Sequence, residues 1–133
     1  MKVNFRFPLF RLKKVIARRT PRFVPPTSAE KEILRLHIEK RLALFNKDYG
    51  FTYRRITIRN QRTRWGSASR SGNLNFNYRM TFLPPHLSDY VIVHELCHLG
   101  EFNHSKKFWD LVARTIPDHR ALRKELRTIP LAR

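Results

Sequence analysis

Several residue types are scarce in this chain of 133 residues, and each scarcity excludes a class of protein. Its single cysteine, Cys97, cannot form an internal disulfide and cannot build a cysteine-only metal site. No apolar run reaches the roughly 18 to 20 residues that a membrane-spanning helix requires. We therefore expect a protein that works in the cytoplasm and does not enter a membrane.

Acidic residues are also scarce, with 10 Asp and Glu against 28 Lys and Arg, which gives a net charge of +18. Neither residues 1–27 nor residues 49–88 contain an acid. A surface field of this sign attracts polyanions. Nucleic acid or another polyanion is therefore a candidate partner, while the composition carries no sign of the oligomeric state.

The length and the 41% content of hydrophobic residues predict one compact domain. Pro25 and Pro26 divide the chain into a basic N-terminal arm, residues 1–24, and a domain over residues 25–133. Apolar residues alternate with polar residues and proline at the start of the arm, which indicates an extended or strand-forming segment.

Hydrophobic periodicity predicts the elements of the domain. Thr27 and Glu30 form a capping box ahead of a helix that continues to Gly50, because apolar residues recur there at steps of three and four. Over residues 51–80 the period falls to two, which indicates three antiparallel strands with a hairpin turn at residues 70–73.

Three more helices are expected after the strands. They begin near the Pro84 and Pro85 pair, at Ser105 and near Pro117, and Gly100 is expected to end the first of them. The order predicts an α+β fold in which helices cover one face of a small antiparallel sheet.

The first of these three helices carries the sequence HELCH at residues 94–98, an HExxH motif. Positions four apart on a helix differ by only about 40° around its axis, so His94 and His98 project from one face and can share a zinc ion. Glu95 lies beside them, where a carboxylate can remove a proton from a zinc-bound water. The motif predicts one Zn²⁺ ion held on this helix, with Glu95 as the catalytic residue beside it.

A catalytic zinc needs a third protein ligand, and two downstream residues are candidates. If the helix continued unbroken, Glu101 would extend the face that carries His94. If Gly100 ends the helix, the chain can turn back and bring His104 to the metal. We favour His104, because glycine is a common helix terminator and imidazole a common zinc ligand.

Further motifs accompany HExxH: RWGSAS at residues 64–69, GNLNFN at residues 72–77, DYVIVHELCHL at residues 89–99 and NHS at residues 103–105. Together these motifs, within residues 25–127, resemble the YgjP-like metallopeptidase domain, a minimal zincin related to the WLM and SprT-like families. The resemblance implies a zinc-dependent hydrolase whose ligands are His94, His98 and His104 and whose catalytic base is Glu95. The family commonly has cysteine where Ala68 stands.

Polar side chains on the outward positions of the strands could line a groove for an extended peptide or a phosphate backbone. The candidates for substrate binding are Arg64, Asn75, Asn77 and Arg79. The competing interpretation is a solvated sheet face on which the two asparagines stabilise the hairpin.

The sequence thus predicts a zinc metallopeptidase that hydrolyses peptide or protein substrates with a Glu95-activated, zinc-bound water. Two alternatives stay open. One is a metal-dependent phosphohydrolase that acts on nucleotides, and the other is a nucleic-acid-binding module with a structural zinc.

Overall fold

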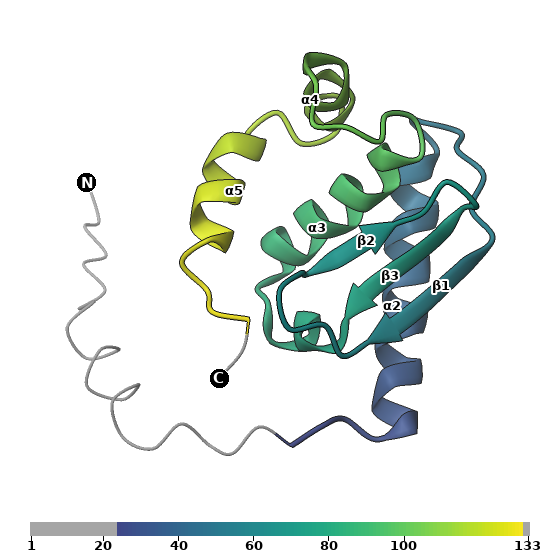
Figure 1. Cartoon of the computed structure of the whole chain (residues 1–133), viewed down its shortest axis with the longest axis vertical. Coiled ribbons are helices and arrows are strands. Elements are labelled where there is room, and N and C mark those ends of the chain that lie inside the picture. Colours follow the sequence, from purple (N-terminus) through teal and green to yellow (C-terminus); the bar gives the residue numbers. More distant parts are fainter. Residues whose placement is uncertain (1–23, 132–133) are drawn as a thin grey trace, which may run out of the picture.

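The computed structural model describes residues 24–131 of the chain (Figure 1). Nearly all of the expected N-terminal arm, residues 1–23, lies outside the described residues. The elements are α2 (Ser28–Asn46), β1 (Arg55–Arg59), β2 (Gly66–Ala68), β3 (Asn73–Asn77), the 3-10 helix η1 (Tyr78–Phe82), α3 (Pro85–His98), α4 (Lys106–Ala113) and α5 (His119–Leu126). None of the helices in this range combines the length and apolar character needed to cross a membrane.

Helix α2 begins at the predicted capping box. The Thr27 hydroxyl accepts a hydrogen bond from the Glu30 amide at 3.2 Å, and the Glu30 carboxylate accepts one from the Thr27 amide at 2.7 Å. The helix ends at Asn46 rather than at the expected Gly50. Its end is fixed by the Asn46 side chain, which accepts a hydrogen bond from the Phe51 amide and donates one to the Phe51 carbonyl.

The three strands form one sheet in the order β1-β3-β2. The β2–β3 hairpin is antiparallel as predicted, but β1 pairs with β3 in parallel, so the sheet is mixed and the expectation of a wholly antiparallel sheet is wrong. An antiparallel sheet was expected because consecutive strands were assumed to pair. In the structure β3 lies between β1 and β2 and pairs with both of them. The loop from β1 to β2 therefore crosses the end of β3.

Asn77 holds this crossover loop. Its side-chain amide donates hydrogen bonds to the Gln61 carbonyl at 2.6 Å and the Arg64 carbonyl at 2.8 Å. Its side-chain oxygen accepts one from the Arg79 amide, which begins η1. The strand alternation expected to reach residue 80 thus ends at Asn77, and the chain continues as a 3-10 helix.

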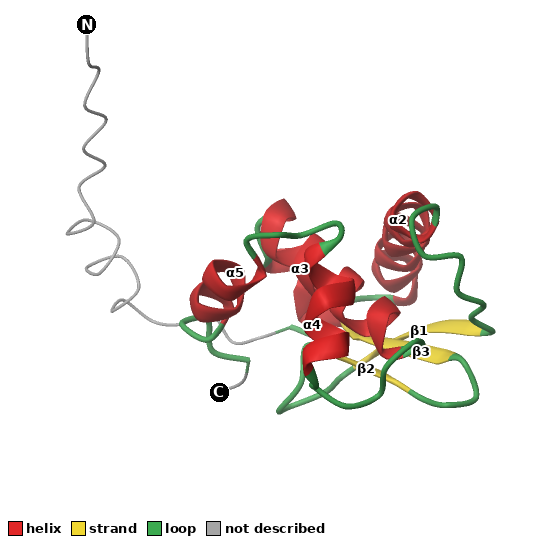
Figure 2. Ribbon diagram, turned by 90° about the horizontal axis from the view of Figure 1, so that it is seen from above, coloured by secondary structure: helices red, strands yellow, loops and turns green. Residues whose placement is uncertain are grey.

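Helices α2 and α3 cover the same face of the sheet (Figure 2). Leu74 and Phe76 of β3 are fully buried beneath these helices. Ile38 of α2 and Ile92 of α3 are fully buried as well. The guanidinium of Arg41 on α2 also binds Asp89 of α3 through two hydrogen bonds of 2.9 and 2.8 Å. Because α4 and α5 pack against α3 as well, α3 is the central element of the fold.

Candidate metal centre

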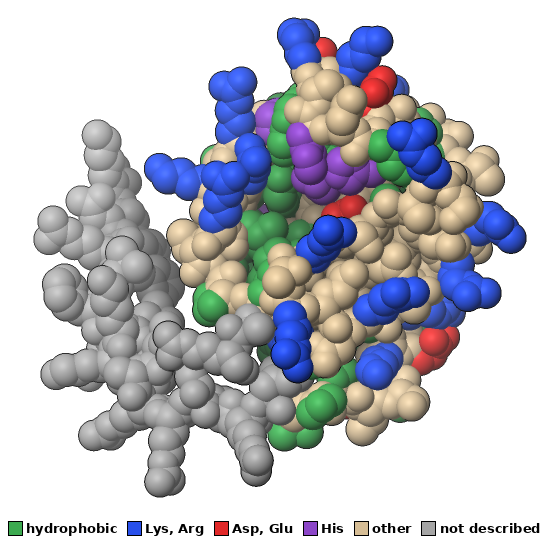
Figure 3. All heavy atoms as spheres, in the orientation of Figure 1, with side chains coloured by type: hydrophobic (Ala, Val, Ile, Leu, Met, Phe, Trp, Pro, Cys, Tyr) green, Lys and Arg blue, Asp and Glu red, His purple; other side chains and the backbone are tan. Residues whose placement is uncertain are grey.

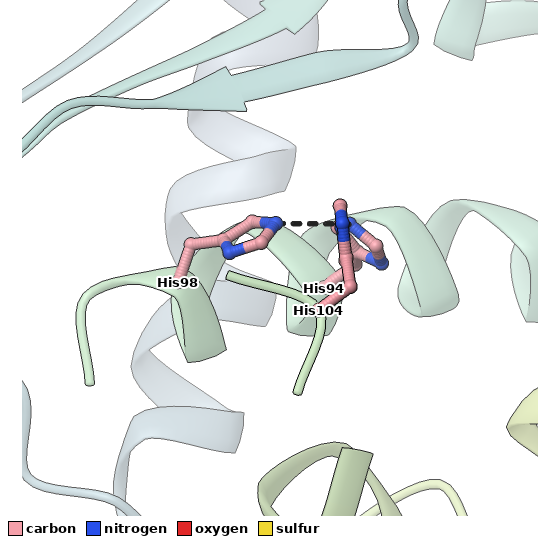
Figure 4. Close-up of side chains that lie close together, drawn as sticks. All are labelled: His94, His98 and His104. Carbon is pink, nitrogen blue, oxygen red and sulfur yellow. Dashed lines mark hydrogen bonds between the residues drawn. The ribbon is translucent and has the colours of Figure 1, made fainter. Parts of the chain in front are cut away.

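Helix α3 places two histidines on one face, one turn apart. The Nε2 atoms of His94 and His98 are 3.1 Å from each other (Figure 4). The expected i, i+4 geometry is therefore present in the last turn of the helix. His98 is buried and His94 is partly buried, so neither ring is free to move away into solvent.

His104 comes to the same point from the segment between α3 and α4. Its Nε2 atom lies 3.1 Å from the Nε2 atom of His94, and the three rings converge in Figure 4. Ser105 follows at once and caps α4, because its hydroxyl accepts a hydrogen bond from the Phe108 amide. The third histidine is thus fixed between the end of one helix and the beginning of the next.

The turn after α3 depends on Gly100 through close packing. A Cβ atom at this position would lie 2.6 Å from Cζ and 2.9 Å from Cε1 of Phe51, a separation that real side chains do not tolerate. Helix α3 ends at His98, two residues before this glycine. The chain then turns against the Phe51 ring and carries His104 back towards the helix.

Among the described residues, the group that could hold a metal consists of His94, His98 and His104. Glu101, the alternative third ligand, is not part of this group. It acts through its backbone: the His98 Nδ1 atom lies 3.0 Å from the Glu101 carbonyl. A carbonyl can only accept, so Nδ1 carries the proton and Nε2 keeps the lone pair that a metal requires.

The donor set fits zinc. Tetrahedral zinc with bonds of about 2.0 to 2.1 Å to imidazole nitrogen places its ligands roughly 3.3 Å apart, close to the Nε2 separations observed here. Burial lowers the pKa of all three rings, and that of His94 falls to about 3 because the neighbouring imidazoles add to the effect of burial. The rings are therefore neutral at pH 7, which is the form that binds metal.

Glu95 follows His94 directly on α3, and its side chain is buried, with 6% of the residue exposed. Burial raises the pKa of its carboxyl to about 8, against an opposing effect from the Arg64 guanidinium. Strand β2 makes room for this side chain at Gly66, where a Cβ atom would lie 2.8 Å from the Glu95 Cγ atom and 3.0 Å from the Asn75 carbonyl.

A cleft of about 360 Å³ opens beside His94 and Glu95. In the surface view, histidine side chains and an acidic group meet in a recess with basic side chains on both sides (Figure 3). The cleft is lined by Trp65, Gly66, Tyr90, Val91, His94, Glu95, Arg123, Leu126, Arg127, Ile129 and Leu131. Three converging nitrogen ligands, a buried carboxyl group and an open, mostly apolar cleft together can hold a metal ion beside a group that exchanges protons.

Comparison with known proteins identifies the family. The model of the YgjP-like metallopeptidase domain matches residues 27–129. The chain belongs to the YgjP-like family. It is therefore a hydrolase of the metallopeptidase class, and the metal that this class requires is in most cases zinc.

Solved structures share the fold of this YgjP-like domain. The metallopeptidase zymogen of Pyrococcus abyssi abylysin is 22% identical with a TM-score of 0.63, over 68% of this chain and 92% of that one. The metallopeptidase zymogen of Methanocaldococcus jannaschii jannalysin is 22% identical with a TM-score of 0.56, over 69% and 97%. No curated protein matches the sequence significantly. The two structural likenesses confirm the α+β zincin-like architecture.

The four expected substrate-binding residues of the YgjP-like domain lie outside the lining of the cleft. Arg64 is exposed and close enough for its charge to act on Glu95. Asn75 lies between Leu74 and Phe76 on β3, so it faces away from the helices, where it donates a hydrogen bond to the Ser67 hydroxyl. Asn77 is fully buried rather than outward, and the Arg79 guanidinium bonds Asn60 and the Gln61 carbonyl.

Sequence reasoning missed several residues that shape the site. Gly66 was part of a recognised motif, and its signal is a glycine inside a strand, which often marks a close approach. Arg123 and Arg127 had no such signal, because a short basic helix shows which of its faces is apolar but not what that face packs against.

Proposed function

We propose that this protein hydrolyses peptide bonds with one zinc ion bound by His94, His98 and His104 and with Glu95 as the general base. The observation that supports this proposal best is the convergence of three imidazole Nε2 atoms next to a buried carboxylate in an open cleft. Membership of a metallopeptidase family supports the same reading.

Zinc, when bound, supplies a Lewis acid that polarises the substrate carbonyl and makes a water molecule acidic. Burial alone favours the protonated form of Glu95, and the positive charge of a bound zinc ion would favour its carboxylate. In that form Glu95 takes the proton of the attacking water and passes it to the departing amine. Because Gly66 has no side chain, the Glu95 carboxylate has the space to face the cleft.

The alternatives predicted from the charge are a nucleotide phosphohydrolase and a nucleic-acid-binding module with a structural zinc. The ligand set argues against the structural zinc, because such a zinc is normally closed by four protein ligands, whereas only three histidines converge among the described residues. Membership of a metallopeptidase family favours the peptidase over the phosphohydrolase. For substrate contact we retain Arg64 from the sequence candidates, since its charge reaches Glu95. Asn75, Asn77 and Arg79 have structural partners instead.

The first prediction concerns Glu95→Gln. We expect this variant to keep its zinc and to lose about 10²-fold or more of its peptidase activity, because the amide cannot accept the proton of water. Zinc content by elemental analysis and cleavage of an unfolded protein would be measured beside wild type, with nucleoside triphosphates as a second substrate. Unchanged turnover by Glu95→Gln would remove this residue from the mechanism, and consumption of nucleotides alone would favour the phosphohydrolase.

The second prediction tests the third ligand. His104→Ala should lose zinc, because two imidazoles leave the tetrahedral ion without half of its coordination shell. Glu101→Ala and His86→Ala are the controls: Glu101 contributes a backbone carbonyl, and the exposed His86 pairs with Glu125 away from the metal. Both controls should retain one zinc per chain. Full zinc in His104→Ala would refute the ligand set.

A further inference from the structure

The cleft beside the metal centre has an apolar wall. Trp65 contributes from the segment just before β2, and Tyr90 and Val91 contribute from α3. Leu126 contributes from the end of α5, and Ile129 and Leu131 from the segment after it. Tyr90 and Val91 are buried and therefore belong to the rigid core. A wall of this kind accepts one large apolar side chain, whose burial there is favourable by the hydrophobic effect.

Two arginines stand on the same wall. Arg123 and Arg127 both line the cleft, and they are spaced four residues apart at the end of α5, so they lie on one side of it. Both side chains are exposed. The Arg123 guanidinium lies over the Trp109 ring at 5.1 Å from its centroid, which holds its charge next to the metal centre.

The charges of these arginines reach the site. Burial raises the pKa of Tyr90 to about 12, and the charges of Arg123 and Arg127 oppose this rise. Burial lowers the pKa of His94 and His104, and the charge of Arg123 adds to that lowering. Glu125, the acid of the same helix, pairs with His86 at 3.0 Å instead. Within residues 24–131 no ion pair involves Arg123 or Arg127, so their guanidinium groups are open to a carboxylate from outside.

We propose that the preferred substrates are acidic peptides, in which a large apolar side chain enters the cleft and a nearby carboxylate binds Arg123 and Arg127. This substrate class rests on the proposed peptidase function. The planar guanidinium fork matches a carboxylate in a bidentate arrangement, which gives both affinity and orientation. The carboxylate is either an acidic side chain of the peptide or its free C-terminus.

The test measures peptide binding to zinc-loaded Glu95→Gln by fluorescence anisotropy, which does not depend on turnover. The probes are labelled peptides with one central Leu or Phe flanked by Glu, Gln or Lys, each with a free and an amidated C-terminus. We expect the Glu-flanked peptide to bind roughly tenfold more tightly than its Gln counterpart. A preference that follows Glu in amidated peptides identifies the side chain, whereas one that disappears on amidation identifies the C-terminus.

Variants of α5 assign the effect to named residues. Adding Arg127→Gln or Arg123→Gln to the Glu95→Gln background should weaken the preference for Glu, and the charge reversal Arg123→Glu with Arg127→Glu should favour the Lys-flanked peptide. Lys124→Gln is the matched control, since it removes one positive charge from the same helix at a position that does not line the cleft. Circular dichroism and zinc content confirm that each variant is folded.

Two results would overturn the proposal: equal binding of Glu- and Gln-flanked peptides that amidation of the C-terminus does not weaken, or a preference for the carboxylate that Lys124→Gln reduces as much as Arg127→Gln does. Cleavage of an unfolded protein by wild type is measured in parallel. If wild type cleaves it while the acidic preference is absent, this substrate class fails and the peptidase function stands. If wild type cleaves nothing while the Arg-dependent preference persists, the peptidase function fails and the carboxylate recognition stands.

Discussion

Gly66 shows how one missing side chain supports the site. The space that its Cβ atom would fill is occupied by Glu95 on one side and by the Asn75 carbonyl on the other. A side chain can rotate away from such a contact, but the backbone carbonyl of a paired strand cannot. Any larger residue at position 66 must therefore displace Glu95 or part the two strands.

We predict that Gly66→Ala lowers kcat about 10²-fold and leaves zinc binding intact, because a misplaced general base costs this much while the three histidines are untouched. Kinetics and elemental analysis on the same preparation would check this. Ser67→Ala on the same strand is the control, since Ser67 lies on the opposite face, beside Asn75. Loss of zinc together with activity in Gly66→Ala would show that β2 supports the histidines instead.

At the scale of elements, α2 contributes to stability without contacting the metal. Ile38 is fully buried against the core, whereas Leu36 on the same helix is 48% exposed. Truncating a buried side chain removes its transfer free energy and leaves a cavity, while truncating an exposed one does neither. The two positions separate packing from helix propensity within one element.

Ile38→Ala should lower the free energy of unfolding by about 3 kcal/mol, and Leu36→Ala by less than about 1 kcal/mol. Denaturant unfolding with chelator present throughout would measure both, so that metal affinity does not contribute. If Leu36→Ala costs as much as Ile38→Ala, the outer face of α2 is covered in solution.

The helices and the strands differ in how far the sequence predicts them. Caps and prolines are local signals, so α2, α3 and α4 begin where Thr27, Pro85 and Ser105 indicate. Alternation in the strands identifies their inner faces but not their neighbours, and the parallel pairing of β1 with β3 was missed for that reason. Asn77 appears outward by alternation, and only the crossover loop above it makes it a buried residue.

The same distinction applies to the site. The HExxH spacing predicted that His94 and His98 would lie together because it is a property of one helix turn. His104 was a choice between two candidates, and its position depends on Gly100 packing against Phe51, which is distant in sequence. The contribution of α5 to the cleft depends on docking against α3, which no local pattern encodes.

For the whole molecule, the hydrophobic core borders the metal centre, where the buried Phe108 ring packs on the His94, His98 and His104 rings at centroid distances of 4.9, 4.4 and 5.1 Å. The core spans α2, the sheet, α3 and α4, and its apolar residues run from Leu34 to Ile116. The buried His98 and Glu95, a proposed metal ligand and the proposed general base, lie beside it. Part of the positive charge lies apart from both the core and the metal centre. The exposed Arg55 and Arg59 of β1 lie on the sheet face that the described helices do not cover (Figure 2).

We predict that chelation of zinc lowers Tm by about 10 °C and leaves the protein folded. A ligand that binds only the folded state stabilises it, by about 2.7 kcal/mol at a hundredfold excess over Kd, so its removal can only destabilise. Thermal scans with and without chelator would measure the change, and His104→Ala should show none. Unfolding of wild type at 25 °C on chelation would mean that the core depends on the metal.

The attachment of the third histidine has a consequence for how metal is exchanged. His94 and His98 stand on one rigid helix turn, whereas His104 is carried by the short segment between α3 and α4. A bound ion would close a loop of only a few residues, and closing so short a loop removes little chain entropy from the unfolded state. If these three histidines hold the ion as proposed, we expect loading and release to require displacement of the His104 segment alone, so that metal exchange is faster than unfolding of the domain.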